Sequence, residues 1–309
     1  MCSSQIESFL RHRKYKTNGF KVTISHGLLT FEITDARDYR QLLIISPNNG
    51  GLGQSRLLTW KKLKSRYRKE SENTMEFSHA SSAELFDISC LILNICEFKD
   101  SQLFLNFGSV DTSEWNLVVA KLIDADIHRL TVNDRIISEV LLTLILDGFP
   151  KHKHVQFYAE LSTHFDHPNA LQYKSSYYYD GRWVKLENLF SIRNVDDVKL
   201  YRTNLDCSDF NKFLQYWVDC DEFMLRSIEI RLKDGTVYDE DVITDQLTTV
   251  SNHAVHYPII FMKSKKDAGQ KYVLGRMELY ETYLTFSTWD PNEKYSDIFQ
   301  SLMKKESND

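Results

Sequence analysis

Three glycines in a short stretch are the first residues whose types and spacing could support chemistry. Gly50, Gly51 and Gly53 follow a predicted strand and precede a predicted helix, a context in which backbone N–H groups can cradle a phosphate. The stretch lacks the G-K-[ST] ending of a P-loop, and no acidic residue follows at the position that dinucleotide-binding folds use. A flexible loop is therefore the favoured interpretation. A nucleotide- or phosphate-binding enzyme that uses the Gly50–Gly53 loop is an alternative.

Histidines and cysteines provide no comparable site. The histidines that lie near one another in sequence form separate pairs: His152 and His154, His164 and His167, His253 and His256. A zinc site requires three or four converging ligands, and the chain contains neither H-E-x-x-H nor CxxC. The G-x-S-x-G motif of a serine nucleophile is also absent from the sequence. We therefore expect no metal, no cofactor and no catalytic residue, and hence a protein that is not an enzyme.

A run of basic residues from Lys61 to Lys69 is the best candidate for nucleic-acid binding. Its cations, together with Trp60 and Tyr67, could follow a phosphate backbone. Trp60, Leu63 and Tyr67 recur at helical spacing, however, which first indicates an amphipathic surface helix. An RNA-binding protein that uses the Lys61–Lys69 helix is thus a second alternative. A net charge of -5 for the whole chain argues against nucleic acid as the partner.

The composition excludes several broad classes of protein. A chain of 309 residues with 42% hydrophobic and 26% charged residues can form a large core and is not intrinsically disordered. The polar N-terminal segment lacks the apolar stretch of a signal peptide, and the longest apolar run, Val140 to Leu146, is too short to cross a bilayer. Five widely spaced cysteines argue against a secreted disulfide framework. We expect a cytoplasmic or nuclear protein with no membrane partner.

Hydrophobic periodicity predicts the elements that must position any site. The predicted strands are 20–24, 28–33, 41–45, 88–95, 127–132, 155–158, 198–201, 227–232, 257–261, 272–279 and 283–286. The predicted helices are 4–11, 60–69, 115–122, 136–145, 186–190 and 210–217, whereas 70–82 and 164–181 are expected to be loop or irregular. Alternation of strands and helices favours parallel pairing. We therefore expect an α/β fold whose strand–helix repeats resemble an irregular leucine-rich-repeat-like array, with β-rich N- and C-terminal segments.

Several spaced motifs occur in order between Trp183 and Ile230. W-V-K-L-E-N-L at 183–189 precedes the strand at 198–201, and N-K-F-L-Q-Y-W at 211–217 precedes L-R-S-I-E-I at 225–230. This order resembles the F-box associated type 2 domain of the large nematode F-box families, with its W-x-x-L-E-N-L, N-x-F-L-x-x-W and L-x-x-[IL]-x-I blocks. The residues that match the structural motif of the family are Trp183, Leu186, Asn188, Leu189, Asn211, Phe213, Leu214 and Trp217.

The resemblance implies a division of the chain. Residues 1–18 would be the remnant of the last F-box helix and a linker, 19–83 a β-rich N-terminal part, 84–290 the F-box associated type 2 α/β domain, and 291–309 a C-terminal tail. The L-P-x-x-x-L start and the two leucine-rich helices of a complete F-box have no counterpart in the sequence. We therefore expect a truncated F-box that does not dock on the Skp-type adaptor.

The function that the resemblance implies is protein recognition. The chain would be a non-enzymatic protein-interaction module, similar to the substrate-recognition part of a Skp–cullin–F-box ubiquitin ligase receptor, which acts in protein degradation. Its expected partner is a protein substrate, joined by a Skp-type adaptor only if an F-box is present. The candidate contact is the aromatic stretch Tyr177, Tyr178 and Tyr179, because tyrosine is common at interface hot spots. Packing of these tyrosines on the sheet is the alternative interpretation.

Overall fold

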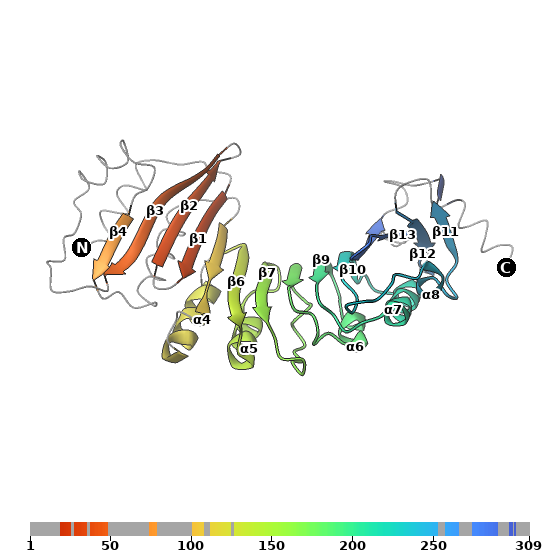
Figure 1. The fold of residues 1–309 in the computed structure, drawn as a ribbon, viewed down its shortest axis with the longest axis horizontal. Helices are drawn as coiled ribbons and strands as arrows, with labels where there is room; N and C mark the ends of the chain where they lie inside the picture. The colour runs from red at the N-terminus through yellow and green to blue at the C-terminus, as the bar shows by residue number, and fades with distance from the viewer. Residues whose placement is uncertain are drawn as a thin grey trace. The chain divides into compact units, whose positions relative to one another are not determined.

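The computed structural model describes the chain in several segments that form two compact units. The described residues are 19–25, 28–35, 38–48, 74–78, 101–107, 112–124, 127–252, 257–265, 274–289, 297–298 and 300. The first unit comprises Met1–Ala159 and the second comprises Glu160–Asp309. Both units are mixed α/β (Figure 1). The boundary between the units lies inside the segment 84–290 that the resemblance assigns to one domain.

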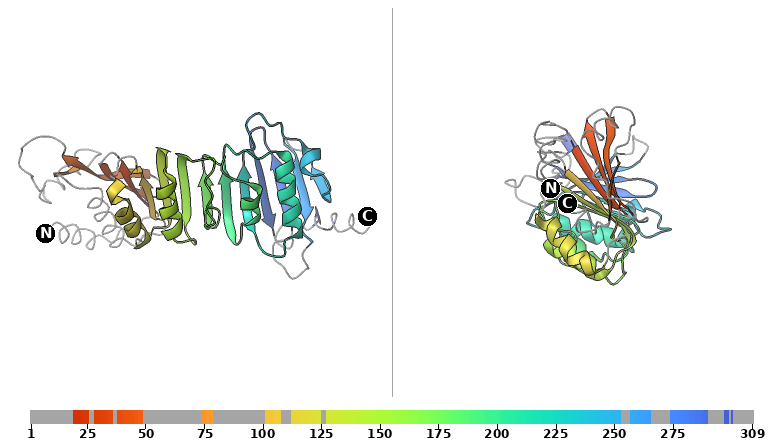
Figure 2. Two further views of the ribbon diagram at one scale, coloured as in Figure 1. Left: turned by 90° about the horizontal axis from the view of Figure 1, so that it is seen from below. Right: turned by 90° about the vertical axis from the view of Figure 1, so that its left-hand side faces the viewer.

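The first unit is a mixed sheet with helices on one face. Its elements are β1 (Gly19–Ser25), β2 (Leu28–Asp35), β3 (Asp38–Asn48), β4 (Thr74–Ser78), β5 (Ser101–Leu105), η2 (Thr112–Glu114), α4 (Trp115–Asp124), β6 (Arg129–Ile136), α5 (Glu139–Gly148) and β7 (His154–Glu160). The strand order is β4-β3-β2-β1-β5-β6-β7, and the predicted strands 20–24 and 28–33 are present as the antiparallel pair of β1 and β2. Strands β5 and β6 pair in parallel. The helices α4 and α5 cover the same face of the sheet (Figure 2).

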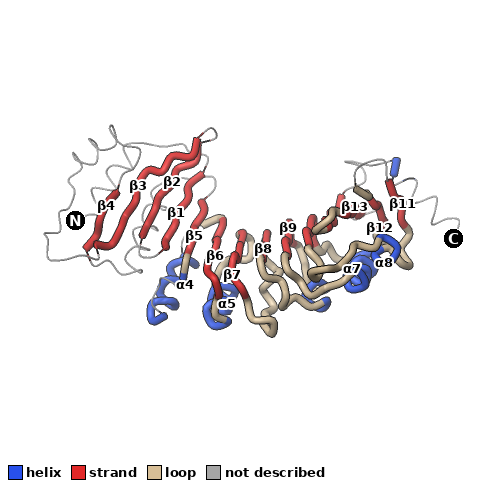
Figure 3. The backbone as a smooth tube through the Cα atoms, viewed as in Figure 1, coloured by secondary structure: helices blue, strands red, loops and turns tan. Residues whose placement is uncertain are grey.

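The second unit places three parallel strands beside an antiparallel group. Its elements are β8 (Ser175–Tyr178), α6 (Leu186–Phe190), β9 (Val195–Leu200), α7 (Cys207–Asp219), β10 (Leu225–Ile230), α8 (Glu240–Ile243), β11 (Thr249–Asn252), β12 (Ile259–Lys263), β13 (Leu274–Leu279) and β14 (Leu284–Trp289). The strand order is β8-β9-β10-β14-β13-β12-β11. Strands β8, β9 and β10 are mutually parallel, and β10 pairs antiparallel with β14. The segment that leads into β8 contains no helix (Figure 3).

Helix α7 is stabilised by an N-cap at its start and by an apolar stripe that packs on the sheet. The Asp206 side chain accepts a hydrogen bond from the backbone N–H of Asp209 at 2.9 Å, as an N-cap should. Phe213 and Trp217, one turn apart, both contact the ring of Phe286 on β14 edge-on, with ring centroids 6.3 and 4.9 Å apart. This packing fixes α7 on one face of the sheet, and α6 and α8 lie on the same side (Figure 1).

Most elements predicted within the described residues are present, but several short elements, β5 among them, were not predicted. The segment 70–82, predicted to be a loop, contains β4, and the segment 164–181, predicted to be irregular, contains β8. Both strands are short, at 5 and 4 residues, so their alternation was too brief to detect. Helix α8 and strand β11, each of 4 residues, were missed for the same reason.

Some expectations lie outside the described residues. These are the helix at 4–11 with the F-box remnant at 1–18, the Gly50–Gly53 loop, the Lys61–Lys69 helix, the strand at 88–95 and the His253–His256 pair. The proposals attached to them therefore stay predictions. In the part of the chain that the structure describes, no helix has the length and hydrophobicity needed to cross a bilayer.

Candidate functional site

Most of the residues that match the motifs of the F-box associated type 2 domain lie in the core of the second unit. Trp183, Leu189, Asn211, Phe213, Leu214 and Trp217 are buried, whereas Leu186 and Asn188 are partly exposed. Trp183 packs edge-on against Phe165 and Tyr178, with ring centroids 5.2 and 5.1 Å apart. The buried members of the motif therefore position the sheet and its helices, and their side chains are not accessible to a partner.

Asn211 shows how a buried polar residue of the motif serves the fold. Its Nδ2 donates hydrogen bonds to the carbonyl oxygens of Ile243 and Asp245, both at 2.9 Å. Its Oδ1 accepts a hydrogen bond from Gln215 Nε2 at 3.0 Å. Since a buried amide without partners would be costly, these bonds explain why asparagine is tolerated at a buried position of α7. They fasten α7 to the end of α8.

The three consecutive tyrosines do not form an irregular contact loop. Tyr177 and Tyr178 belong to β8, so their side chains point to opposite faces of the sheet. Tyr178 is fully buried, its hydroxyl donates to the carbonyl oxygen of Ala170 at 2.8 Å, and burial raises its pKa. Tyr177 is partly exposed, and Tyr179 follows the strand with 45% of its surface exposed. The candidate contact is therefore wrong for Tyr178, while Tyr177 and Tyr179 reach the surface.

Tyr177 belongs to a set of polar side chains that point away from α6, α7 and α8. Strand pairing places these residues in rows across the sheet. One row is Ser175, Asp197, Ser227, Ser287 and Arg276, and the next row is Tyr177, Lys199, Glu229, Thr285 and Glu278. Four further residues lie directly beyond the ends of these strands: Tyr201 after β9, Arg231 after β10, Tyr280 after β13 and Tyr283 before β14. We call these residues the polar face of the second unit.

Ion pairs and hydrogen bonds order the polar face. Lys199 Nζ lies 2.9 Å from Glu229 Oε2, across the parallel pair of β9 and β10. Tyr201 donates its hydroxyl to the same carboxylate. On β13, Arg276 forms an ion pair with Glu278, which also accepts a hydrogen bond from Tyr280 at 2.7 Å. Each of these two carboxylates therefore binds one cation and one phenol.

Burial changes the acid–base behaviour of this face. Burial and, next, the hydrogen bond to Glu229 raise the pKa of Tyr201, and burial and the hydrogen bond to Glu278 raise the pKa of Tyr280. Both phenols thus stay protonated donors at neutral pH. Burial also raises the pKa of Asp197, although Lys199 and the hydroxyl of Ser227 act in the opposite direction. The ionised form of Asp197 is therefore less stable in the folded protein than that of a surface aspartate.

Tyrosine rings extend the same face. The rings of Tyr177 and Tyr201 lie with centroids 5.4 Å apart, and the guanidinium of Arg231 lies 5.7 Å from the centroid of Tyr201. At the turn between β13 and β14, Tyr280 and Tyr283 stack with centroids 4.5 Å apart. Aromatic rings with polar tips are common at protein interfaces, because they bury a large area with little loss of side-chain entropy.

One end of the face is apolar and already covered in part. Phe261 and Leu274 form a buried cluster against which Trp289 and Ile298 pack. Leu274 pairs with Trp289 in the same row, and Phe261 pairs with Arg276 of the polar face. The contact by Ile298 shows that a residue near the C-terminus reaches this end of the face.

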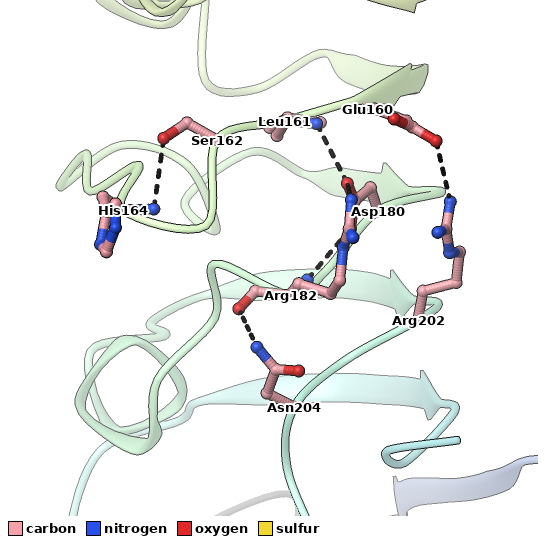
Figure 4. Close-up of polar contacts among 8 residues, drawn as sticks. All are labelled: Glu160, Leu161, Ser162, His164, Asp180, Arg182, Arg202 and Asn204. Atoms are coloured by element: carbon pink, nitrogen blue, oxygen red, sulfur yellow. Dashed lines mark hydrogen bonds and ion pairs between the residues drawn. The ribbon is translucent and has the colours of Figure 1, made fainter. Parts of the chain in front are cut away.

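An ion pair with a buried carboxylate lies directly beyond the end of β8. Asp180, whose side chain is 0% exposed, accepts two hydrogen bonds from the Arg182 guanidinium, at 2.7 and 2.6 Å (Figure 4). It also accepts a bond from the backbone N–H of Leu161 at 3.1 Å. Burial alone would raise the pKa of Asp180, but the hydrogen bonds from Arg182 and Leu161 outweigh it and lower this pKa. Asp180 thus joins the segment that follows β7 to the end of β8.

Neither a metal site nor an activated thiol is found in the described residues. No group of three His, Cys, Asp or Glu side chains there could hold a metal ion. His164 is exposed, while His167 is buried and accepts a hydrogen bond from the backbone N–H of Asn169 at 3.2 Å. Cys207 and Cys220 are buried, and burial raises the pKa of the Cys207 thiol. Such a thiol is a poor nucleophile at neutral pH.

The charged residues of the polar face were not recognised in the sequence, although a signal for them exists. Polar residues alternate at every second position in D-V-K-L-Y at 197–201, S-I-E-I-R at 227–231 and R-M-E-L-Y at 276–280. This period marks a strand with one buried and one solvated face. Which solvated residues would pair depended on the strand order, which the sequence pattern did not specify.

Comparison of the chain with protein-family models, with curated proteins and with solved structures finds no match.

Proposed function

We propose that this chain is a non-enzymatic protein-interaction module that binds its partner on the polar face of the second unit. The proposal follows the resemblance to the F-box associated type 2 domain and assigns to the chain the substrate-recognition role of a Skp–cullin–F-box ubiquitin ligase receptor. It also includes the view that the parallel strand–helix units form an irregular array resembling leucine-rich repeats. Such arrays use an extended sheet surface for binding.

The observation that supports the proposal most is the composition of the polar face. Tyr201 and Tyr280 combine aromatic area with hydrogen-bonded hydroxyls, and the carboxylates of Glu229 and Glu278 form ion pairs with neighbouring cations. A partner that docks here meets side chains whose rotamers are already restricted, so less entropy is lost on binding.

Affinity capture with paired variants tests the binding role. The full chain and its Tyr177→Ala/Tyr201→Ala variant are used as baits in parallel. The matched control is Lys212→Ala, which alters an exposed side chain on α7. We expect proteins retained by the wild type and by Lys212→Ala to be lost from the double variant. If every captured protein is retained equally by all three baits, the polar face is not the binding surface.

The adaptor is tested separately with the purified chain and a Skp-type adaptor. Residues 1–309 should not bind it, because the sequence provides no counterpart of the two leucine-rich F-box helices. Fusion of a complete F-box in front of the chain should restore binding. Tight binding by the unmodified chain would contradict the expected loss of docking.

A further inference from the structure

Arg231 stands out on the polar face because its guanidinium is held in place without a carboxylate partner. Its Nε–H donates to the carbonyl oxygen of Thr282 at 3.0 Å, and its Cζ lies over the ring of Tyr201, 5.7 Å from the centroid. Among the described residues, Arg231 forms no ion pair, whereas Lys199 and Arg276 on the same face do. Arginine carries five N–H donors, so the N–H groups of its two terminal nitrogens remain for a ligand.

We propose that Arg231 binds an anionic side chain, a carboxylate or a phosphate, of the protein partner. The inference rests on the proposed function and specifies the chemistry of the partner at that surface. The partly exposed guanidinium presents a planar pair of donors, the geometry that matches two oxygens of a carboxylate or phosphate. Its orientation is set before binding by the turn carbonyl and by the ring of Tyr201.

The charges around Arg231 favour an isolated anion carried by a peptide. Glu229 is already bonded to Lys199 and Tyr201, so it is not left to neutralise Arg231. A partner with one acidic group therefore complements Arg231, which has no carboxylate partner among the described residues. The aromatic rings of Tyr201 and of the stacked Tyr280–Tyr283 pair can contact the residues on either side of that acidic group.

The same carboxylates argue against a nucleic acid on this surface. Asp197, Glu229 and Glu278 share the face with Arg231, and a phosphate backbone that runs across it would pass close to all three. Nucleic-acid sites instead neutralise several phosphates with clustered cations. A peptide can place one anion at Arg231 and neutral residues elsewhere.

Fluorescent peptide pools test the inference with the full chain. In each pool one central position is fixed as glutamate, phosphoserine, lysine or alanine, and the flanking positions are degenerate. We expect the glutamate or the phosphoserine pool to bind about tenfold more tightly than the lysine pool, with the preference reduced at high salt. Preference for glutamate alone or for phosphoserine alone distinguishes a carboxylate from a phosphate ligand.

Variants at Arg231 assign the preference to this residue. Arg231→Gln should remove the preference for acidic pools, and Arg231→Lys should keep part of it because the charge remains but the planar pair of donors is lost. Lys212→Gln, which removes a charge from α7, should leave the preference for acidic pools unchanged. Urea unfolding shows whether each variant is folded.

The outcomes separate the inference from the proposed function. If all pools bind equally and Tyr177→Ala/Tyr201→Ala weakens them together, the inference is overturned while the proposed function stands. A preference for acidic pools that survives Arg231→Gln also overturns it. If no pool binds, the inference fails as well, and the capture experiment with Tyr177→Ala/Tyr201→Ala decides the proposed function by itself.

Discussion

Replacement of Asp180 by alanine should destabilise the second unit strongly and in a pH-dependent way. The carboxylate is fully buried and accepts hydrogen bonds from Leu161 and from both Nε and Nη2 of Arg182. Without it, the N–H of Leu161 stays buried and loses its partner, because Leu161 is only 6% exposed. An unsatisfied buried donor costs about 1–3 kcal/mol.

The loss of the ion pair adds to this cost, but by less than for a fully buried pair. The side chain of Arg182 is 34% exposed, so water can hydrate its guanidinium in the variant. Breaking a fully buried pair costs about 3–5 kcal/mol. Since one partner can be hydrated here, we expect a total decrease of about 3 kcal/mol in the free energy of unfolding at neutral pH.

Urea unfolding of wild type and variant, followed by circular dichroism from neutral to acidic pH, measures this effect. The folded pKa of Asp180 is lowered, so its contribution is complete above the unfolded pKa of about 3.9 and is lost as the pH falls through the folded pKa. The difference between the two proteins should therefore shrink below about pH 4. Asp234→Ala, in an exposed turn, is the control and should change the stability little at any pH.

Two results would refute this reasoning. A loss below about 1 kcal/mol at neutral pH would mean that the pair adds nothing beyond a surface ion pair. A difference that stays constant down to strongly acidic pH would mean that the ionised carboxylate is not the stabilising group.

Further predictions concern packing, capping and the polar face. Gly275→Ala should lower the stability by about 1–3 kcal/mol, because a Cβ there would lie 2.6 Å from Phe286 and 3.0 Å from Trp217; equal stability in urea would contradict this close approach. Asp206→Ala should cost about 1 kcal/mol through loss of the α7 cap, and Asp206→Asn should restore most of it. Asp197→Asn should raise the stability at neutral pH, because its pKa is raised in the folded state, so its ionisation above the unfolded pKa of about 3.9 favours unfolding. A gain that persists below that pH would show another cause.

The regular part of the fold was predictable where apolar residues recur over two turns or more. The stripe of Phe210, Phe213, Leu214 and Trp217 predicted the helix at 210–217, which is present as α7 with Asp206 as its N-cap. Strand β8 could not be predicted because S-S-Y-Y at 175–178 has only four residues. The buried side chains, Ser176 and Tyr178, both carry hydroxyls, so the segment shows no alternation of apolar and polar residues. Short elements are stabilised by contacts with neighbouring strands and helices, and a local sequence pattern carries no information on those contacts.

The polar face was predictable only in part for a similar reason. Tyr177 was expected to contact a partner, but the importance of Lys199, Glu229 and Arg231 depends on the parallel register that pairs Lys199 with Glu229. The fold class was predicted correctly as α/β, while the order β10-β14-β13, with its switch to antiparallel pairing, was not. A sequence pattern specifies which residues are solvated, and the register specifies which of them meet.

Site-specific photo-crosslinking tests the central claim most directly. A benzophenone side chain is placed at Tyr177 on the polar face, or at Lys212 on the exposed side of α7, and the chain is irradiated in cells. A protein partner bound to the polar face should be crosslinked from position 177 and not from position 212. Partner adducts from position 212 with none from position 177 would contradict the account.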